Sequence, residues 1–423
     1  MLIFAIIVVA ILVLMVLVNA PITTHLILGG FSRKVNDDRK IDKEVEIAIS
    51  ALGSQQEYHP VTLNNIDGRI PYKSGVMLKP TVHMGYLKLL LSEIQFLTRS
   101  LQDTNTRALV VYAGAAPSNK AYILHEMFPT VSFLLIDIAK FNILGVKDKS
   151  IIQHCNTVHD VGDSNKRIFL LKALMTIDLC QEIKEVSKKF DQLFFWSDIR
   201  TRSGDEEPGD KDIVLNLAQQ ANWVHVFGSG VKYMLKFRLP FRNEIFSDTY
   251  TTSDDFAKYK ELFGENIIDS YNHAKVSNIF RYLPGDIYLQ AFSGSNSTET
   301  RLVGQYSGKL FSYDCIEYDE KLYYYNNVER PFKLFKNLRV DIENGIDMCG
   351  DCALEATILD EYEKWSTSVG GKGKIKDIFG KKWIDVLYSI NKKRRDKNGH
   401  GRLLKKPSPD DVDKMRAKTG KYN

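Results

Sequence analysis

Short apolar runs alternate along this chain with longer segments of helical periodicity. Such alternation favours strands that are buried on both faces and joined by helices, which is a doubly wound α/β sheet. We expect strands at 108–114, 131–137, 150–155, 191–198, 222–228, 233–238, 286–292 and 301–306, and helices near 85–100, 118–128, 165–189 and 211–221.

Four ionisable residues lie in apolar settings that make a charge costly. Lys88 interrupts GYLKLLLSEIQFL, Asp198 ends QLFFWSD, Lys236 lies in VKYMLKFRLPF, and Glu299 precedes RLVGQY. Ligands of open α/β sheets bind at the carboxyl ends of the strands, so these groups are expected to converge there. Two lysines and two carboxylates in one cleft suggest proton abstraction. For any one of them taken alone, a snorkelling or salt-bridged residue is the preferred reading.

The segment ALVVYAGAAPSNKAYILHEMF reads as a buried strand, a turn of small residues and a helix. The next strand, VSFLLID, ends in Asp137. A tight turn at Gly114 lets the backbone approach a nucleoside, and an acid after the second strand can accept hydrogen bonds from ribose hydroxyls. Because the turn lacks the full glycine set of the dinucleotide fingerprint, it favours a shorter ligand such as S-adenosylmethionine over NAD.

Several motifs, in the same order, resemble the poxvirus-type cap-specific mRNA 2′-O-methyltransferase family, whose members double as the regulatory subunit of the viral poly(A) polymerase. The motifs are GYLKLLL, VVYAGAAP, LLID, SDIRTRSGDEEP, LKFRLPF, STETRL and YDEKLYYYN, and they cover roughly residues 80 to 330. The resemblance implies a Rossmann-like methyltransferase fold, S-adenosylmethionine as methyl donor, and a catalytic tetrad of Lys88, Asp198, Lys236 and Glu299 with Lys236 as the base. It also implies donor-site residues, which are Tyr86, Tyr112, Gly114, Asp137 and Asp198.

Three positions depart from the family pattern around the donor. Pro117 is followed by Ser118 where the family has glycine, Tyr86 replaces a glutamine, and Ala139 replaces an arginine. These departures weaken the assignment of the donor site and leave the tetrad intact.

The family holds 7-methylguanine between two aromatic rings with a carboxylate at the base edge, which suits a cationic base. The resemblance places Arg238, one ring at Phe241 and an acid at Asp319 in this cap site, and the second ring falls on Asn296. A plain core position is the alternative reading of Phe241. Two upstream aromatics are candidates for the second ring, Tyr58 and Tyr72.

The first eighteen residues, MLIFAIIVVAILVLMVLV, contain no charged side chain. As a helix they would span about 27 Å, and residues up to 28 extend that length, so we expect a transmembrane anchor. A cleaved signal peptide is the alternative, but there is no basic region before the apolar run. The basic residues that follow, within 33–43, predict a catalytic domain that faces the cytoplasm of an infected cell.

The carboxyl end is strongly basic, with 17 Lys and Arg against 6 Asp and Glu from residue 371 onward. We expect a tail that binds RNA phosphates or an anionic membrane. The alternative is a solvated tail that only increases solubility. The stretch IFGKKWIDVLYSI within it is amphipathic and suited to dock on the core or on lipid. The expected organisation is an anchor at 1–28, a linker at 29–79, a methyltransferase domain at 80–335 with a helical insertion at 242–285, an extension at 336–370 and the tail at 371–423.

Five cysteines give no disulfide framework, and one CxxC pair, Cys349 and Cys352, is a weak zinc signal without a second pair, so no metal is expected. The favoured function is methylation of the ribose 2′-hydroxyl of the first transcribed nucleotide of capped mRNA, by a protein of a large DNA virus. Two alternatives remain: a non-catalytic RNA-binding subunit that supports a viral poly(A) polymerase, and a ribose methyltransferase that acts on uncapped RNA.

Overall fold

The structure, a computed structural model, describes residues 48, 61–73, 85–162, 166–201, 208–246, 252–294, 296–330 and 350–390. Apart from residue 48, all of these fall within one compact unit, Gln55–Asn423. The expected anchor at 1–28 lies outside the described residues. Among the residues described, none of the helices combines the length and apolar character that crossing a bilayer requires.

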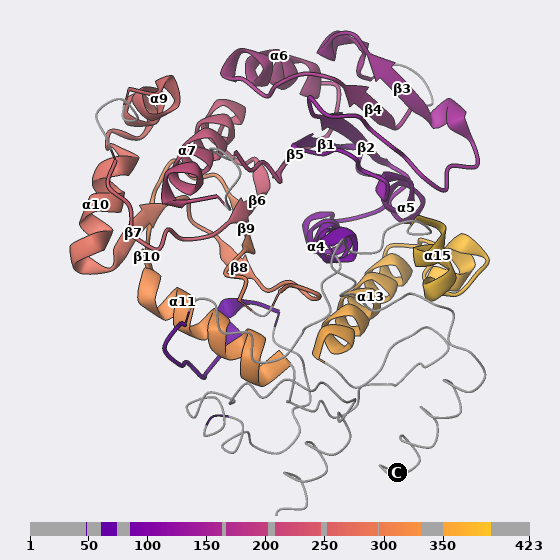
Figure 1. Ribbon diagram of the computed structural model, residues 1–423. Helices are drawn as coiled ribbons and strands as arrows, with labels where there is room; N and C mark the ends of the chain where they lie inside the picture. Colours follow the sequence, from indigo (N-terminus) through magenta and orange to yellow (C-terminus); the bar gives the residue numbers. More distant parts are fainter. Residues whose placement is uncertain are drawn as a thin grey trace, which may run out of the picture. The chain divides into compact units, whose positions relative to one another are not determined.

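An eight-stranded, mostly parallel sheet forms the centre of this unit, with the order β3-β4-β2-β1-β5-β6-β9-β8 (Figure 1). The six strands from β3 to β6 run parallel, and β9 is antiparallel to both β6 and β8. The strand bounds are β1 Ala108–Ala113, β2 Val131–Ile136, β3 Ile152–Cys155, β4 Ile168–Leu171, β5 Gln192–Ser197, β6 Lys232–Phe237, β8 Asp286–Tyr288 and β9 Thr300–Gln305.

Helices cover both faces of the sheet, because successive strand residues point to opposite faces. In β1, Leu109 and Val111 belong to the core beneath one helical layer, and Val110 and Tyr112 belong to the core beneath the other. The first layer contains α6 Ile177–Ser187 and α7 Asp210–Phe227, and the second contains α4 Gly85–Ser100, α5 Ala121–Met127, α13 Gly350–Ser368, α14 Ile375–Phe379 and α15 Trp383–Ile390.

The insertion at 242–285 is helical, as expected, and ends in a short strand. Its two helices, α9 Asp254–Phe263 and α10 Ile267–Ser277, pack against α7. Strand β7 Ile279–Tyr282 pairs with β10 Phe311–Asp314, which leads into α11 Cys315–Tyr324. The α11 helix continues through a turn of π-helix at Tyr325–Glu329.

Two expectations about secondary structure are wrong. The run 222–228 is not a strand, because α7 continues through it to Phe227 and ends at Gly228, whose φ is 91°. Its apolar side chains form the buried face of a helix, and so short an apolar run does not separate helix from strand. The range 165–189 is not one helix either, since β4 occupies 168–171 before α6 begins.

The amphipathic stretch within the expected tail docks on the core. Ile375, Ile378, Trp383 and Leu387 are buried against the α4 and α5 side of the sheet. The folded unit therefore extends at least to residue 390, beyond the tail boundary expected at 371, and residues 391–423 lie outside the described part of the chain.

Candidate active site

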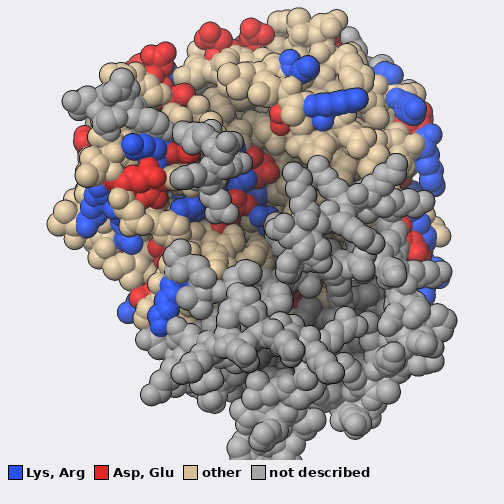
Figure 2. Space-filling model, in the orientation of Figure 1, with Lys and Arg blue, Asp and Glu red and all other residues tan. Residues whose placement is uncertain are grey.

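All four residues of the expected tetrad meet at the carboxyl edge of the parallel strands. Asp198 directly follows β5, Lys236 lies near the end of β6, and Glu299 directly precedes the antiparallel strand β9. Lys88 reaches the same place from the first turn of α4. Figure 2 shows basic and acidic side chains side by side around a hollow on this face, in the region where Figure 1 draws β6.

Ion pairs connect the tetrad into one cluster. Lys88 Nζ lies 2.7 Å from Glu299 Oε1. Lys236 Nζ lies 3.3 Å from Asp198 Oδ1 and 3.3 Å from Glu299 Oε2. Both carboxylates therefore flank the Lys236 ammonium, and Glu299 joins the two lysines.

Two arginines complete the cluster. Arg301 donates to Asp198 Oδ1 at 2.7 Å and its side chain is 2% exposed. Arg200 approaches Glu299 Oε2 at 3.6 Å. Together with Lys88 and Lys236 they place four cations around two carboxylates, so the cluster carries a surplus of positive charge.

That surplus keeps both acids ionised. Burial alone would raise the pKa of Asp198, but Lys236 and Arg301 outweigh it and hold that pKa below its usual value. The pKa of Glu299 lies well below its usual value because Lys88 and Lys236 outweigh the same burial cost. Burial lowers the pKa of the Arg200 guanidinium, and the neighbouring Arg238 adds to that shift. The cluster is therefore electrostatically prepared to receive an anion.

The turn after β1 is held in shape by Asp137. The Asp137 carboxylate accepts hydrogen bonds from the Ala116 N–H at 2.9 Å and the Ala139 N–H at 2.8 Å. Gly114 has a φ of 75°, and a Cβ there would approach Ile199 N to 2.9 Å, so the tight turn requires glycine. A carboxylate has about four acceptor positions, so Asp137 retains capacity for ligand hydroxyls.

Two apolar side chains stand exposed at this part of the edge. Ile138 follows β2 and is 64% exposed, and Leu174 follows β4 and is 68% exposed. Tyr112, near the end of β1, is buried with its ring edge against Trp196, and Tyr86 is half-buried in the first turn of α4. The edge thus offers apolar contacts beside an acid, which suits a nucleoside.

The expected cap residues gather after β6. The Arg238 guanidinium lies 4.2 Å from the centre of the Phe241 ring. The ring of Tyr72 stacks on Phe241, with centroids 5.3 Å apart and an interplanar angle of 29°. Asn296, the residue onto which the family's second ring falls, supplies a carbonyl that accepts from the Tyr72 hydroxyl at 3.3 Å. Of the two candidate replacements, Tyr72 lies at the site, and Tyr58 lies outside the described residues.

The loop that carries Phe241 is fixed from behind by the start of α7 and by the insertion. Asp210 accepts from Phe241 N at 2.7 Å and from Asn243 N at 2.9 Å. Tyr271, in α10, donates to Asp210 at 3.1 Å. The loop is thus held at the backbone N–H groups of Phe241 and Asn243, and the Phe241 side chain is only half-buried. Part of its ring therefore remains accessible to a ligand.

Asp319, in α11, is a buried acid close to this loop. Burial raises its pKa to about 7, although Arg242 and Arg238 oppose the shift. Its Oδ1 atom is buried without a hydrogen-bond partner within the described part of the chain. Such an atom is available to a donor group on a ligand.

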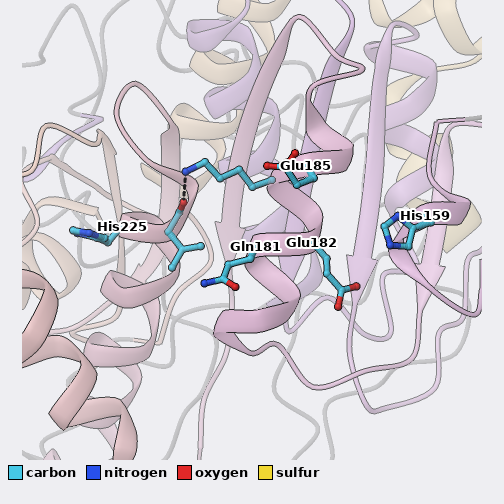
Figure 3. Close-up of a pocket in the computed structure, with 7 residues that line it drawn as sticks. His159, Gln181, Glu182, Glu185 and His225 are labelled. Atoms are coloured by element: carbon cyan, nitrogen blue, oxygen red, sulfur yellow. Dashed lines mark hydrogen bonds between the residues drawn. The ribbon is translucent and has the colours of Figure 1, made fainter.

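A second hollow lies at the other end of α7. A cavity of about 620 Å³ is lined by His159, Gln181, Glu182, Lys184, Glu185, His225 and Val226. Lys184 donates to the Val226 carbonyl at 2.8 Å across it (Figure 3). His225 and Asp210 are separated by most of a helix of 18 residues, about 27 Å long, so this hollow is separate from the charged cluster.

Comparisons with known proteins show which proteins this chain resembles. Residues 58–256 match the family described as poly A polymerase regulatory subunit. This match spans just under half of the chain. Two curated relatives, the cap-specific mRNA (nucleoside-2′-O-)-methyltransferases of Myxoma virus strains Lausanne and Uriarra, are each 24% identical over 294 residues. The alignments cover 66% of this chain and 68% of each relative.

Among solved structures, the bluetongue virus VP4 RNA-capping protein aligns with a TM-score of 0.34 and 9% identity. That alignment covers 73% of this chain and 45% of VP4, so this chain spans less than half the length of that protein. The α/β fold with its mixed, mostly parallel sheet is consistent with a Rossmann-like methyltransferase.

The poly A polymerase regulatory subunit match leaves out Glu299 and Asp319, which lie beyond residue 256. Sequence reasoning missed Arg200 and Arg301 in the cluster. The sequence does contain a pattern that could have revealed these two arginines. Three tetrad members are each followed, two positions later, by an arginine, at 200, 238 and 301. In extended chain, residues two apart share a face, so this spacing indicates arginines directed to the same edge. Of the CxxC pair, Cys352 is buried in α13 and Cys349 lies outside the described residues.

Proposed function

We propose that this protein transfers a methyl group from S-adenosylmethionine to the ribose 2′-hydroxyl of the first transcribed nucleotide of capped mRNA. The observation that carries the proposal is the position of Lys236, which lies 3.3 Å from both Asp198 and Glu299 at the carboxyl edge of the sheet. Homology to cap-specific methyltransferases supports it.

The methyl donor fits the residues at the adjoining part of this edge. Asp137 has acceptor capacity for ribose hydroxyls, and Ile138 and Leu174 offer exposed apolar surface to a flat base. Gly114 brings the backbone close, Tyr112 lies near the end of the strand before this turn, and Tyr86 lies in the first turn of α4. When bound, S-adenosylmethionine supplies an electrophilic methyl group; the protein's part is to hold and orient it.

Lys236 takes the proton of the acceptor hydroxyl in this proposal. Asp198 and Glu299 hold its Nζ atom in place. Glu299 also pairs with Lys88, so it stabilises the positive charge of Lys236 less than an unshared carboxylate would. A general base in reach of the proton contributes typically 10² to 10⁴ in rate. The positive surplus from Arg200 and Arg301 also stabilises the alkoxide that develops.

Phe241 and Tyr72 form the slot for the methylated guanine. Their centroids are 5.3 Å apart, whereas a base between two rings needs two contacts of about 3.5 Å each. Tyr72 must therefore move outward by roughly 2 Å when a base enters. Arg238 directly follows β6 and lies between Lys236 and Phe241 in the chain, where it can meet the triphosphate that joins cap and acceptor nucleotide. Asp319 supplies an acid for the base edge.

The family description favours a second role, as a partner of the catalytic subunit of a viral poly(A) polymerase. In addition, we propose that residues 1–28 anchor the protein in a membrane with the catalytic unit facing the cytoplasm. Resistance of the full chain to carbonate extraction, and its loss on deletion of 1–28, tests the anchor.

Labelled methyl transfer onto a short capped RNA tests the chemistry. The acceptor carries either ribose or 2′-deoxyribose at its first transcribed nucleotide. We expect incorporation only with ribose. Equal incorporation into both RNAs would place the methyl group elsewhere and contradict the proposal.

A further inference from the structure

We infer that the buried ion pair between Glu93 and Lys120 positions the methyl-donor turn against the helix that carries Lys88. The inference rests on the proposed function, because it concerns the donor site. It assigns a role to two residues that do not themselves lie on the reacting groups.

The pair joins two elements that meet at the site. Lys120 Nζ lies 2.8 Å from Glu93 Oε1, and the two side chains are 5% and 1% exposed. Glu93 belongs to α4, five residues after Lys88. Lys120 is the last residue of the turn 114–120, immediately before α5. The pair therefore fixes the distance between the turn and the catalytic helix.

Tyr112, one of the proposed donor-site residues, lies beside the pair. Lys120 Nζ is 5.7 Å from the centre of the Tyr112 ring. Burial raises the pKa of Glu93, while Lys120 and the Tyr112 hydroxyl oppose that shift. Asp198 repels Glu93 and raises its pKa further, which places the pair within electrostatic reach of the tetrad.

The turn also holds the loop after β2. The Pro117 carbonyl accepts from Asn142 N at 2.8 Å, and the Asn119 carbonyl accepts from Leu144 N at 3.3 Å. A shift of the turn would therefore displace the loop next to Asp137 as well. Both sides of the donor site depend on where Lys120 holds the turn.

A buried ion pair is weak evidence for stability, because replacing both partners with apolar groups of similar volume is often neutral. Its directional character suits a positioning role, since an apolar pair permits sliding that a 2.8 Å ion pair does not. Ser118, within the turn, has a φ of 50° at a buried position, a left-handed conformation that is uncommon for residues other than glycine. The ion pair at Lys120 tethers the turn two residues after this position.

The test is the double variant E93L/K120M, with E93D/K120R as the matched variant that keeps the pair and its combined length. Binding of S-adenosylhomocysteine and of capped RNA is titrated separately, and folding is followed by thermal melting. We expect E93L/K120M to bind S-adenosylhomocysteine at least tenfold more weakly, with capped-RNA affinity within threefold of wild type. E93D/K120R should remain within threefold for both ligands.

Two results overturn the inference: wild-type affinity for S-adenosylhomocysteine in folded E93L/K120M, or an equal loss for both ligands, which indicates general structural damage. If E93L/K120M does not fold, the same titrations on E93Q/K120Q decide, with the same expectations. Failure of the wild type to bind S-adenosylhomocysteine would overturn the proposed function together with this inference. If the wild type transfers methyl groups and E93L/K120M binds S-adenosylhomocysteine as the wild type does, only this inference is overturned.

Discussion

Lys88 and Glu299 are separated by 211 positions in the chain, yet their side chains form an ion pair of 2.7 Å at the carboxyl edge of the sheet. The pair links the first turn of α4 to the start of the antiparallel strand β9. It also brings Glu299 within 3.3 Å of Lys236. The fold thus assembles a charged cluster from segments that no local motif contains.

Replacement of Lys236 by methionine should reduce methyl transfer by about 10² to 10⁴, because the variant lacks the proposed base. S-adenosylhomocysteine affinity should stay within threefold of wild type, since Lys236 faces the acceptor. Lys232→Met is the matched control: Lys232 lies on the same strand but donates to the Ser100 carbonyl at 2.9 Å. Single-turnover assays that show wild-type rates for Lys236→Met would rule out the mechanism.

Replacement of Asp137 by alanine should give the reverse pattern. The variant lacks the acceptor for ribose hydroxyls and the two hydrogen bonds that order the turn at Ala116 and Ala139. We expect S-adenosylhomocysteine affinity to fall by tenfold or more, with capped-RNA affinity retained. Asp178→Ala, at an exposed position of α6, is the control. Calorimetry that finds unchanged S-adenosylhomocysteine binding would remove Asp137 from the site.

Cap affinity should depend on pH through Asp319. Its pKa of about 7 means that the folded protein holds this proton at pH 6 and releases it above pH 7. A cationic base favours the ionised acid, so affinity for a 7-methylated cap analogue should rise from pH 5.5 to 7, by at most tenfold per unit. Asp319→Asn should flatten this profile, and the exposed Asp286→Asn should not.

The raised pKa of Asp319 also makes the stability of the fold depend on pH. Here the effect falls as the pH rises, whereas cap affinity increases. The contribution of Asp319 to the free energy of unfolding is full below its unfolded pKa of about 3.9 and is lost as the pH rises through 7. Relative to Asp319→Asn, the wild type should therefore become less stable between pH 5 and 8. Denaturant unfolding that shows a parallel pH dependence for both proteins would contradict the assignment.

The charged cluster was predictable because its four tetrad members lie within apolar runs or next to their ends. Asp198 and Lys236 stand at the ends of strands whose apolar runs are unmistakable. The partners Arg301 and Glu93 were harder to recognise, since a single charge in an amphipathic pattern normally points to solvent. Only the packing shows that Arg301 is 2% exposed and that Glu93 meets Lys120.

The secondary-structure errors have a similar cause. The run 222–228 is mostly apolar because α7 packs against both the sheet and α9, which hides the helical period. The stretch IFLL of β4 is four residues long, too short to separate from a helical pattern that follows it. Tyr72 could not be assigned to Phe241 from sequence, because 168 residues lie between them.

Deletion of residues 391–423 should weaken RNA binding mainly at low salt. This segment carries 12 Lys and Arg against 4 Asp and Glu. Each phosphate that the segment no longer neutralises should flatten the dependence of log affinity on log salt by about 0.7 on single-stranded RNA. The deletion spares the docked helices α14 and α15, so the melting temperature should not change. An unchanged salt slope with weaker attachment to anionic vesicles would assign the segment to the membrane.

The decisive measurement compares methyl transfer from labelled S-adenosylmethionine onto otherwise identical capped and uncapped short RNAs. We predict label in the 2′-O position of the first transcribed nucleotide of capped RNA, at a rate at least tenfold above that on uncapped RNA. Equal rates on both RNAs would indicate a ribose methyltransferase without cap recognition. No incorporation into either RNA, by protein that binds capped RNA, would contradict the account and leave a non-catalytic RNA-binding subunit.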